Sequence, residues 1–338
     1  MPWTDLLLPL SPLYRAAVTA RAHGYARGWL RSVRLAVPGV SVGNVTFGGT
    51  GKTPTVIALA RDLVRRGRRP AVLTRGFRRA TEEPLVLLGP DHGEPVERTG
   101  DEPAELARRL PGVPIVIDAD RVRGGRRAVE LGAGVLLLDD GFQHLRIARD
   151  LDLVLIDAGD PWGGGRLPPR GRLREPVAAL ARASALLVTK VPEDHRRVVH
   201  EIEATATAAG CSAPVLAARL AVERVRTGDG WRLPQALAGR RVLAFAGLGR
   251  PGGFAELLQA SGADIVATRW FADHHHYGDE ELRSLLAEAQ ALDAMPVTTG
   301  KDAVKLAPDA PVWEVEVAMA PLDGSWDGLW RLLGESTP

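Results

Sequence analysis

A glycine-rich loop that ends in lysine and threonine carries the strongest chemical signal in the sequence. The segment 41–54 reads SVGNVTFGGTGKTP, so an apolar stretch runs into the loop and the loop into a helix-like stretch. In such loops backbone N–H groups surround phosphate oxygens, the lysine neutralises the terminal phosphates and the threonine hydroxyl binds Mg²⁺. The predicted ATP-binding residues are Gly48, Gly49, Thr50, Gly51, Lys52 and Thr53. The order of these features favours a nucleotide site over a structural turn, although Thr46 stands where the common pattern has glycine.

Two consecutive carboxylates end a second apolar stretch. The segment 134–144 reads GVLLLDDGFQH, which is typical of the strand whose acidic end holds Mg²⁺, directly or through water, in P-loop enzymes. Asp139 and Asp140 cannot face the same way on a strand. We therefore expect one of them to serve the metal and the other to orient a loop or the acceptor, and the pattern does not say which.

A base near an acceptor hydroxyl would complete a phosphoryl-transfer site. Asp101, in Gly-Asp-Glu-Pro, is one candidate, but it also precedes a helix-like segment, and the local pattern favours a helix cap. His274, the first histidine of FADHHHY, is the other candidate, with a surface loop as its alternative. Three adjacent histidines make poor joint ligands on a strand, which argues against a metal site there.

An α/β framework is predicted to position these residues. Apolar, β-rich segments alternate with helical ones and span 40–44, 70–76, 114–118, 135–140, 153–158 and 185–190. Continuous apolar runs separated by helices predict a P-loop NTPase-type α/β domain, with a mainly parallel sheet covered by helices on both faces. The segment 84–98, with Gly-Pro-Asp-His-Gly in its middle, is predicted as an inserted hairpin.

A second, smaller α/β lobe is expected after this domain. Its predicted strands lie near 242–247, 264–269 and 296–299, with helices between them. Extended segments at 215–227 and 312–319 flank the lobe, and their pairing would make a two-stranded linker that acts as a hinge. The expected division is 1–214 for the P-loop domain, 215–226 for the linker strand, 227–311 for the second lobe and 312–338 for the return strand and a C-terminal helix.

The charges of this globular chain are unevenly placed. A net charge of +2 over 338 residues gives no indication of a nucleic-acid partner, and the single cysteine, Cys211, excludes an internal disulfide. No Asp or Glu occurs from Leu6 to Ala60, a stretch that holds five arginines and Lys52.

A basic amphipathic helix is predicted in this N-terminal stretch, with Ser11 as its cap, Pro12 at its first position and its end near Arg34. One face would carry Tyr14, Val18, Ala22, Tyr25, Trp29 and Val33, and the opposite face Arg27, Arg31 and Arg34. Periodicity alone leaves two equal interpretations, a helix on an anionic membrane surface and a helix packed on its own domain. No apolar run approaches the roughly 20 residues that cross a bilayer, and the opening segment does not have the pattern of a secretory signal, so a cytoplasmic protein is expected.

Taken together, the motifs resemble those of the tetraacyldisaccharide 4′-kinase family. These are membrane-associated, Mg-ATP-dependent enzymes of lipid A (lipopolysaccharide) biosynthesis, which phosphorylate the 4′-hydroxyl of tetraacyldisaccharide 1-phosphate to give lipid IV-A. The resemblance covers nearly the whole chain. Its motifs, in order, are SVGNVTFGGTGKTP, LTRGF, GDEP, DADR, DDGFQH, GRLPPRGRLREP, AGLGRP, FADHHHY and TTGKDAVKL.

The resemblance implies a phosphotransferase with an alcohol acceptor and two α/β lobes joined by a two-stranded linker. It further implies that Asp101 and His274 form a dyad across the cleft, with the aspartate as base toward the 4′-hydroxyl and the histidine orienting it and adjusting its pKa. Glu102, Arg121 and His144 would lie in or near the substrate site. The N-terminal helix would approach an anionic membrane surface, which favours the membrane interpretation and places the protein peripherally on the cytoplasmic face of the inner membrane.

Four positions depart from the family pattern. Phe77, Gly164, Arg172 and Gly300 stand in place of Tyr, Asn, Pro and Glu. None of these changes removes a proposed catalytic group, but substrate contacts near Phe77 and Gly300 are in doubt. The neighbouring arginines Arg166, Arg170, Arg172 and Arg174 are interpreted either as contacts to an anionic headgroup or as a solvated basic loop.

A regulatory ATPase of the partitioning type, a nucleotide-switched membrane binder, is the competing hypothesis. Its loop is similar, but the lysine that precedes the two glycines in that class is replaced here by Phe47. A second lobe that carries His274 would also be unnecessary in a simple switch. A nucleotide-binding module without catalysis would leave Lys52 and the two aspartates unexplained.

Overall fold

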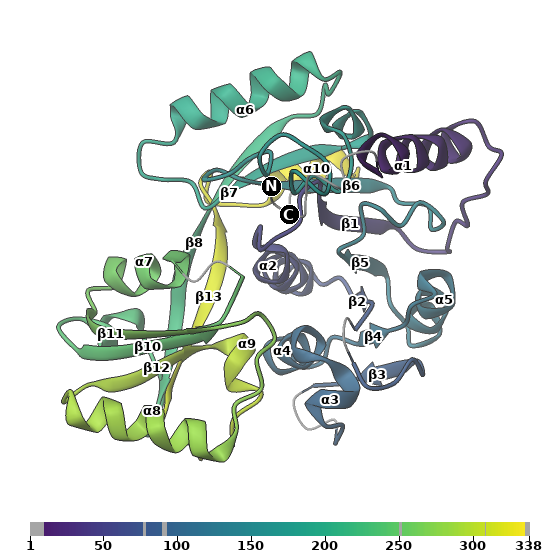
Figure 1. Cartoon of the computed structure of the whole chain (residues 1–338). Helices are drawn as coiled ribbons and strands as arrows, with labels where there is room; N and C mark the ends of the chain where they lie inside the picture. Colours follow the sequence, from purple (N-terminus) through teal and green to yellow (C-terminus); the bar gives the residue numbers. More distant parts are fainter. Residues whose placement is uncertain (1–9, 77–78, 90–92, 250–251, 308, 335–338) are drawn as a thin grey trace.

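The computed structural model has two α/β lobes joined by a pair of long strands (Figure 1). It describes residues 10–76, 79–89, 93–249, 252–307 and 309–334. The strands of the first lobe are β1 (Gly39–Asn44), β2 (Pro70–Thr74), β3 (Leu85–Leu87), β4 (Ile115–Ile117), β5 (Val135–Asp139), β6 (Leu151–Asp157) and β7 (Ala185–Thr189). Its helices are α1 (Leu10–Ala26), α2 (Lys52–Arg65), α3 (Val96–Thr99), α4 (Asp101–Arg109), α5 (Arg121–Glu130), η2 (Val177–Arg182) and α6 (Arg196–Ala208).

The second lobe lies between the two long strands, β8 (Val215–Thr227) and β13 (Trp313–Pro321). Its elements are β9 (Gly230–Arg232), η3 (Pro234–Leu237), β10 (Arg241–Gly247), α7 (Gly252–Ala260), β11 (Asp264–Phe271), α8 (Asp279–Ala291), β12 (Met295–Thr299) and α9 (Gly300–Ala303). After β13, helix α10 (Asp327–Leu332) returns to the first lobe, where the Trp330 indole N–H donates to Asp62 of α2 at 2.6 Å.

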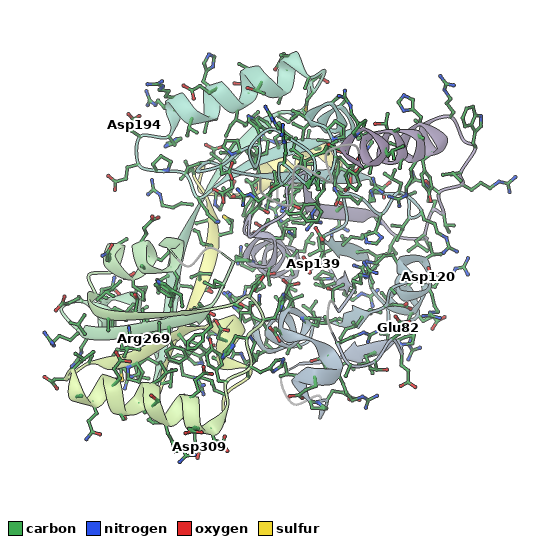
Figure 2. All side chains as sticks on the ribbon, in the orientation of Figure 1. Glu82, Asp120, Asp139, Asp194, Arg269 and Asp309 are labelled. Atoms are coloured by element: carbon green, nitrogen blue, oxygen red, sulfur yellow. The ribbon has the colours of Figure 1, made fainter. Side chains whose placement is uncertain are left out.

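One sheet runs through both lobes, in the order β11-β10-β12-β13-β8-β7-β6-β1-β5-β2-β4-β3. In the first lobe β1 is central and pairs in parallel with β5 and β6, and β3 at the edge is antiparallel to β4. The carboxyl ends of parallel strands meet at one edge of a sheet. That edge therefore receives the glycine loop after β1 and Asp139 at the end of β5, near the middle of the molecule (Figure 2). The predicted P-loop NTPase-type α/β fold is confirmed.

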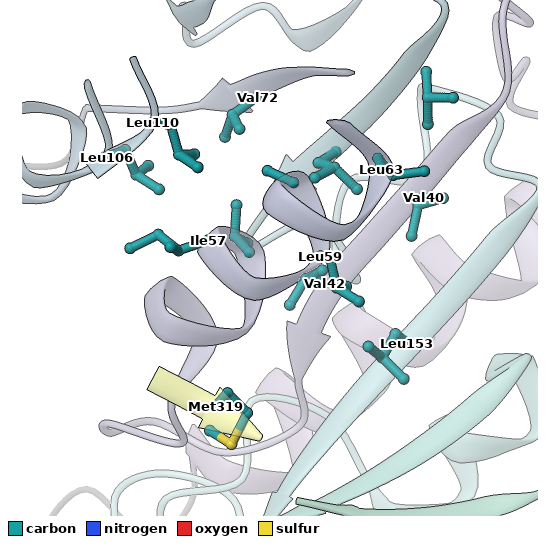
Figure 3. Close-up of a cluster of buried hydrophobic side chains, with 14 of the residues drawn as sticks. Val40, Val42, Ile57, Leu59, Leu63, Val72, Leu106, Leu110, Leu153 and Met319 are labelled. Carbon is teal, nitrogen blue, oxygen red and sulfur yellow. The ribbon is translucent and has the colours of Figure 1, made fainter. Parts of the chain in front are cut away.

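Helix α2 packs its apolar face across the middle of this sheet. Ile57, Leu59 and Leu63 are buried against a cluster that includes Val40 and Val42 of β1 (Figure 3). Burial of each such aliphatic side chain contributes about 1.5 to 3 kcal/mol to the stability of the fold. This packing fixes the first turn of α2, which carries Lys52 and Thr53, at the end of β1.

The two long strands form an antiparallel ribbon that belongs to both lobes. The pairing of β8 with β13 runs from Arg226 opposite Glu314 to Ala218 opposite Pro321. The start of β8 also pairs with β7 of the first lobe, and β13 pairs with β12 of the second. The predicted pairing of the linker strands is confirmed.

Buried ion pairs connect α4 of the first lobe to this ribbon. The Arg109 guanidinium is fully buried and lies 2.7 Å from Glu223 Oε2 on β8 and 3.3 Å from Glu316 Oε2 on β13. The neighbouring Arg108 pairs with Glu314 of β13, with 3.0 Å between Nη1 and Oε2. Because a charge that has left water is strongly destabilising without a partner, these contacts fix α4 against the ribbon.

The N-terminal helix is shorter than predicted. Ser11 lies inside α1 and is not its cap, and the helix ends at Ala26, shortly before Gly28 with its φ of 73°. Beyond that point Val33 forms a β-bridge with Ile147, a sheet contact that a continuing helix would not allow. The predicted extension to Arg34 is therefore wrong, and Trp29, Arg27 and Arg31 do not lie on a common helix with Tyr14.

The predicted apolar face of this helix is half-buried. Tyr14, Val18, Ala22 and Tyr25 are partly shielded from solvent, and the Tyr14 hydroxyl donates to the carbonyl oxygen of Arg174 at 2.8 Å. Tyr14 also packs against a core cluster of the first lobe. Packing on its own lobe thus describes this part of the helix. Within the described residues, no helix combines the length and apolar character that a membrane span requires.

The predicted hairpin over 84–98 is also wrong. Leu85–Leu87 form β3, but this strand pairs with β4, with Leu85 opposite Ile117. The second half of the segment contains the short helix α3 in place of a returning strand. The apolar edge of β4 offers β3 a buried partner, which local turn signals could not reveal. The predicted turn at Pro90 to His92 and the departure at Phe77 lie outside the described residues.

We predict that Arg109→Met lowers the free energy of unfolding by about 3 to 5 kcal/mol, because it removes the buried cation that Glu223 and Glu316 share and leaves the buried Glu316 with the partly exposed Arg224. Urea unfolding followed by circular dichroism measures this loss. The control is Arg197→Met, since the exposed Arg197 pairs with Glu201 on the surface of α6, and its loss should cost less than about 1 kcal/mol. Equal losses in the two variants would contradict a stabilising role for the buried network.

Candidate active site

The glycine loop closes around the first turn of α2. Gly51 is the N-cap of this helix, with a φ of 87° that side chains other than glycine rarely adopt. A Cβ atom at Gly51 would also lie 2.7 Å from Met319 Cε of β13, so the return strand packs directly on the loop. Lys52 and Thr53 follow as the first helical residues. The free N–H groups and the positive end of a helix dipole make this a binding site for an anion such as phosphate.

Residues at the end of β7 tether the same loop. The Thr189 hydroxyl donates to the carbonyl oxygen of Thr50 at 2.8 Å. The Lys190 ammonium donates to the carbonyl oxygen of Gly49 at 2.5 Å and to Asp157 Oδ2 at 2.8 Å. Neither residue could be predicted from the sequence, because a Thr-Lys pair after an apolar strand has no distinctive spacing from a loop 139 residues away. Together they hold the loop open toward a ligand.

The two aspartates after β5 have different environments. Asp139 is the last residue of the strand and is buried, and its Oδ2 accepts a hydrogen bond from the Thr74 hydroxyl at 3.3 Å. Asp140 has already left the strand, with a φ of 53°, so its side chain reaches Lys52 (3.6 Å) and Arg174 (2.7 Å). Burial would raise the pKa of Asp140, but Lys52 and Arg174 outweigh burial and lower it. For Asp139, burial and then the charges of Glu102 and Asp140 raise the pKa to about 7.

This group of oxygen donors fits Mg²⁺. The Thr53 hydroxyl and the carboxylates of Asp139 and Asp140 are the hard oxygen ligands that this cation prefers. The crowding of carboxylates that raises the pKa of Asp139 also marks a local lack of positive charge, which a divalent cation would supply.

The three predicted substrate residues lie around this acidic pair. Arg121 begins α5 and donates to the carbonyl oxygens of Asp118 (2.6 Å) and Asp139 (3.4 Å). Burial lowers the pKa of Arg121 to about 10, which keeps it charged at neutral pH. Burial and the charge of Arg121 lower the pKa of His144 to about 4, so this imidazole is neutral there. Glu102, on α4, is close enough to raise the pKa of Asp139 and that of Lys301 in the second lobe.

Asp101 and His274 meet across the two lobes. Gly100 is the N-cap of α4, and Asp101 is the first helical residue, so the cap interpretation is wrong. Its Oδ2 lies 3.0 Å from His274 Nδ1. A carboxylate only accepts hydrogen bonds, so Nδ1 carries the proton of this contact. Burial would raise the pKa of Asp101, but the His274 hydrogen bond and the charge of Lys305 outweigh burial and lower it to about 2.

Two lysines of the second lobe lie at or beside this contact, and neither was predicted from the sequence. The Lys305 ammonium lies 3.0 Å from Asp101 Oδ2. Lys301 donates to Asp273 Oδ1 at 2.6 Å, next to His274 in the chain. Both lysines lie in TTGKDAVKL with a spacing of four residues, which places two cations on one side of a helical turn. This spacing was the signal in the sequence from which the two lysines could have been identified.

The departures from the family pattern have definite places where the structure describes them. Arg172 pairs with Asp160, and Arg174 is bound to Asp140, so neither belongs to a purely solvated loop. Gly164 has a φ of 83°, as a tight turn requires. Gly300 is buried where the lobes meet, and its carbonyl oxygen accepts from Arg108 Nη2 at 3.2 Å.

The arrangement brings the predicted phosphate-binding loop, the predicted metal-binding aspartates and the ionised carboxylate of Asp101 to one region of the molecule. Glu102 links the two halves, since it follows Asp101 in α4 and acts electrostatically on Asp139. Chemically, such a set can bind a nucleoside triphosphate with Mg²⁺ and deprotonate an alcohol beside it.

Comparisons with known proteins agree with this geometry. The model of the tetraacyldisaccharide-1-P 4′-kinase family matches residues 3–333. A tetraacyldisaccharide 4′-kinase of Anaeromyxobacter sp. (strain Fw109-5) is 45% identical over 313 residues, which cover 90% of this chain and 83% of the relative. The enzyme of the same name from Syntrophus aciditrophicus is 43% identical over 327 residues, covering 91% and 85%. The crystal structure of LpxK from Aquifex aeolicus in complex with ATP is similar with a TM-score of 0.78 at 31% identity, over 98% of each chain.

We predict that Lys190→Met weakens ATP binding about tenfold. A charge-assisted hydrogen bond to the loop contributes about 1.5 to 3 kcal/mol, and only part of this energy contributes to the affinity for ATP. Calorimetric titration with ATP and Mg²⁺ measures the affinity. Arg197→Met, a loss of one exposed cation on α6, is the control and should bind as the wild type does. An unchanged affinity in Lys190→Met would remove Lys190 from the support of the loop.

Proposed function

Because the chain belongs to the tetraacyldisaccharide-1-P 4′-kinase family, we propose that it transfers the γ-phosphoryl group of ATP to the 4′-hydroxyl of a tetraacyldisaccharide 1-phosphate. The product is lipid IV-A, a precursor in lipid A biosynthesis. The observation that carries the proposal is the 3.0 Å contact between Asp101 and His274, because it places an ionised carboxylate of the first lobe in hydrogen-bonding contact with a histidine of the second lobe.

The nucleotide side of the reaction belongs to the glycine loop and α2. Backbone N–H groups of Gly48 to Gly51 bind the phosphates, and the Lys52 ammonium neutralises the terminal ones. Thr53, Asp139 and Asp140 would hold Mg²⁺, which would neutralise phosphate charge when bound. Lys52 exchanges its partner Asp140 for the phosphates, so the nucleotide enters a site whose cation is already in place.

In the transfer step the 4′-oxygen attacks the γ-phosphorus, and the bond from that phosphorus to the bridging oxygen of ADP breaks. The hydroxyl proton passes to Asp101, and ADP leaves with the bonding electron pair. Asp101 is available as acceptor because its lowered pKa, about 2, keeps it ionised at every physiological pH. A positioned base of this kind contributes about 10² to 10⁴-fold in rate. His274 orients Asp101 through the Nδ1 hydrogen bond.

The acceptor side belongs to Glu102, Arg121 and His144. Arg121 stays cationic and suits an anionic acceptor such as a sugar phosphate. His144 is neutral, because its pKa lies near 4, so it offers hydrogen bonds to sugar hydroxyls without adding charge. Glu102 lies between these residues and the second lobe and can accept from the same sugar.

Exposed apolar side chains near α1 suit contact with the acyl chains and the membrane surface. Leu13, Trp29 and Leu30 are exposed, and the Arg27 guanidinium lies over the Trp29 ring at 5.4 Å. Aromatic and basic side chains together favour the interface of an anionic membrane. We place the protein peripherally at the cytoplasmic face of the inner membrane, where the acylated acceptor would be bound.

The alternative function is that of a regulatory ATPase of the partitioning type. A label-transfer assay distinguishes this ATPase from the kinase. With γ-labelled ATP, Mg²⁺ and detergent-dispersed tetraacyldisaccharide 1-phosphate, we expect the label in the lipid. The matched control is the same reaction without acceptor, which should release little label. Free phosphate released equally in both reactions, with the lipid unlabelled, would favour the ATPase and contradict the kinase.

We predict that Asp101→Asn lowers kcat for lipid phosphorylation by about 10² to 10⁴-fold, because the amide cannot take the proton. ATP affinity should stay within about twofold, since Asp101 makes no contact with the glycine loop among the described residues. Turnover and calorimetric ATP binding measure the two effects. Near-normal turnover in this variant would remove Asp101 from the mechanism.

A further inference from the structure

Lys305 lies in direct contact with Asp101, although the two residues are far apart in the chain. Its ammonium lies 3.0 Å from Asp101 Oδ2 and 3.0 Å from Asp302 Oδ1, and it donates to the carbonyl oxygen of His275 at 3.1 Å. The Lys305 side chain is 2% exposed, and those of Asp101 and Asp302 are 7% and 0% exposed. A lysine this buried has left water, so its three contacts are needed to stabilise its charge.

Two donors of the second lobe act on the same oxygen of the carboxylate. His274 Nδ1 and Lys305 Nζ each lie 3.0 Å from Asp101 Oδ2. Among the hydrogen bonds of the described residues, none ends on Oδ1 of Asp101. Two donors on one oxygen fix the rotation of the carboxylate about its Cβ–Cγ bond, and they draw negative charge toward Oδ2. The second oxygen stays available to a ligand.

We propose that Lys305 is a positioning residue for the base, which together with His274 holds Oδ2 of Asp101 so that Oδ1 receives the acceptor's proton. The reacting carboxylate of the first lobe is thus held by two side chains of the second lobe. This inference rests on the proposed kinase function and names the group that prepares its base. Lys305 itself touches neither the acceptor nor the nucleotide.

The charges that face Asp101 explain why the lysine matters. His274 and its neighbour Asp273 follow β11, whereas Lys301, Asp302 and Lys305 lie in and after α9. Glu102 is the neighbouring carboxylate on α4 itself. Lys301 is paired with Asp273, so Lys305 is the cation of this group in direct contact with Asp101. Without Lys305, its charge and its hydrogen bond would no longer lower the pKa of Asp101, and that pKa would rise from about 2.

A purely structural role for Lys305 makes a different prediction. In that case the lysine would serve only to neutralise Asp302. That carboxylate also accepts from the Gly247 N–H at 3.1 Å and the Thr299 hydroxyl at 2.8 Å, so as an amide it would keep an oxygen for these donors. The double variant Lys305→Met with Asp302→Asn therefore removes the lysine without leaving Asp302 as a buried charge that has lost its cation. It tests whether Asp101 or Asp302 is the partner that matters.

The experiment compares lipid phosphorylation by Lys305→Met, Lys305→Gln and the double variant. We expect kcat to fall about 100-fold in each, with the KM for ATP within about twofold of the wild type. The acid limb of kcat/KM for the lipid acceptor should shift to higher pH by at least about one unit. Lys305→Gln keeps a hydrogen-bond donor without the charge, so it is the variant of choice if Lys305→Met does not fold. Arg269→Met, which removes a cation paired with Glu288 on the second lobe (Figure 2), is the control and should behave as the wild type.

Two results would overturn the inference. Wild-type kcat and an unmoved acid limb in Lys305→Gln or Lys305→Met would show that the lysine does not act on the base. Recovery of wild-type kcat in the double variant would assign Lys305 to Asp302 alone. Failure of the wild-type protein to label the lipid would instead reject the proposed function, before any variant is compared.

Discussion

A carboxylate buried where two lobes meet is the constraint on which the site depends. Asp101 is 7% exposed, and an ionised group so far from water is stable only with cationic or hydrogen-bonding partners. Its partners, His274 and Lys305, both belong to the second lobe. The proposed base therefore has its partners only when the lobes are in contact, and the rest of the fold can be understood as the means of keeping the lobes together. The Arg109 and Arg108 ion pairs hold the helix that begins at Asp101 against the ribbon between the lobes.

The acidic residues of the site differ in their pKa values, and therefore in the roles that suit them. Asp101 and Asp140 have lowered pKa values because each contacts cations, whereas the pKa of Asp139 is raised by burial and then by the neighbouring carboxylates Glu102 and Asp140. A group that is ionised without ligands can act as a base or as a counter-ion for Lys52. Asp139, whose surroundings disfavour its ionised form, would be stabilised in that form by a metal cation bound beside it. Consecutive aspartates acquire opposite behaviour because Asp140, with its positive φ, turns out of the strand that buries Asp139.

Much of this could be predicted from the sequence, since local pattern determined it. Strands such as β1 and β5 are continuous apolar runs, and the glycine loop is defined by spacing within a few residues. The failures share a physical cause, namely contacts between residues far apart in the chain. The local pattern predicted Asp101 as a helix cap. In the structure Gly100 is the cap, and the Asp101 carboxylate contacts His274, 173 residues later in the chain. The end of α1 was misplaced because the bridge between Val33 and Ile147 is invisible to periodicity. Lys190 and Lys305 were overlooked because only the folded chain brings them to the loop and the base.

The return of the chain to its first lobe has a consequence for how the protein is made. Met319 of β13 packs on Gly51, and Trp326, Leu329 and Trp330 belong to the same core cluster as Val40 of β1. A ribosome therefore releases the glycine loop early, but the side chains that cover it are among the last to be translated. The nascent first lobe must wait, with part of its core open, until almost the whole chain has emerged. A chain that stops after the second lobe would lack the strand that packs on its glycine loop and the helix that completes the core of its first lobe.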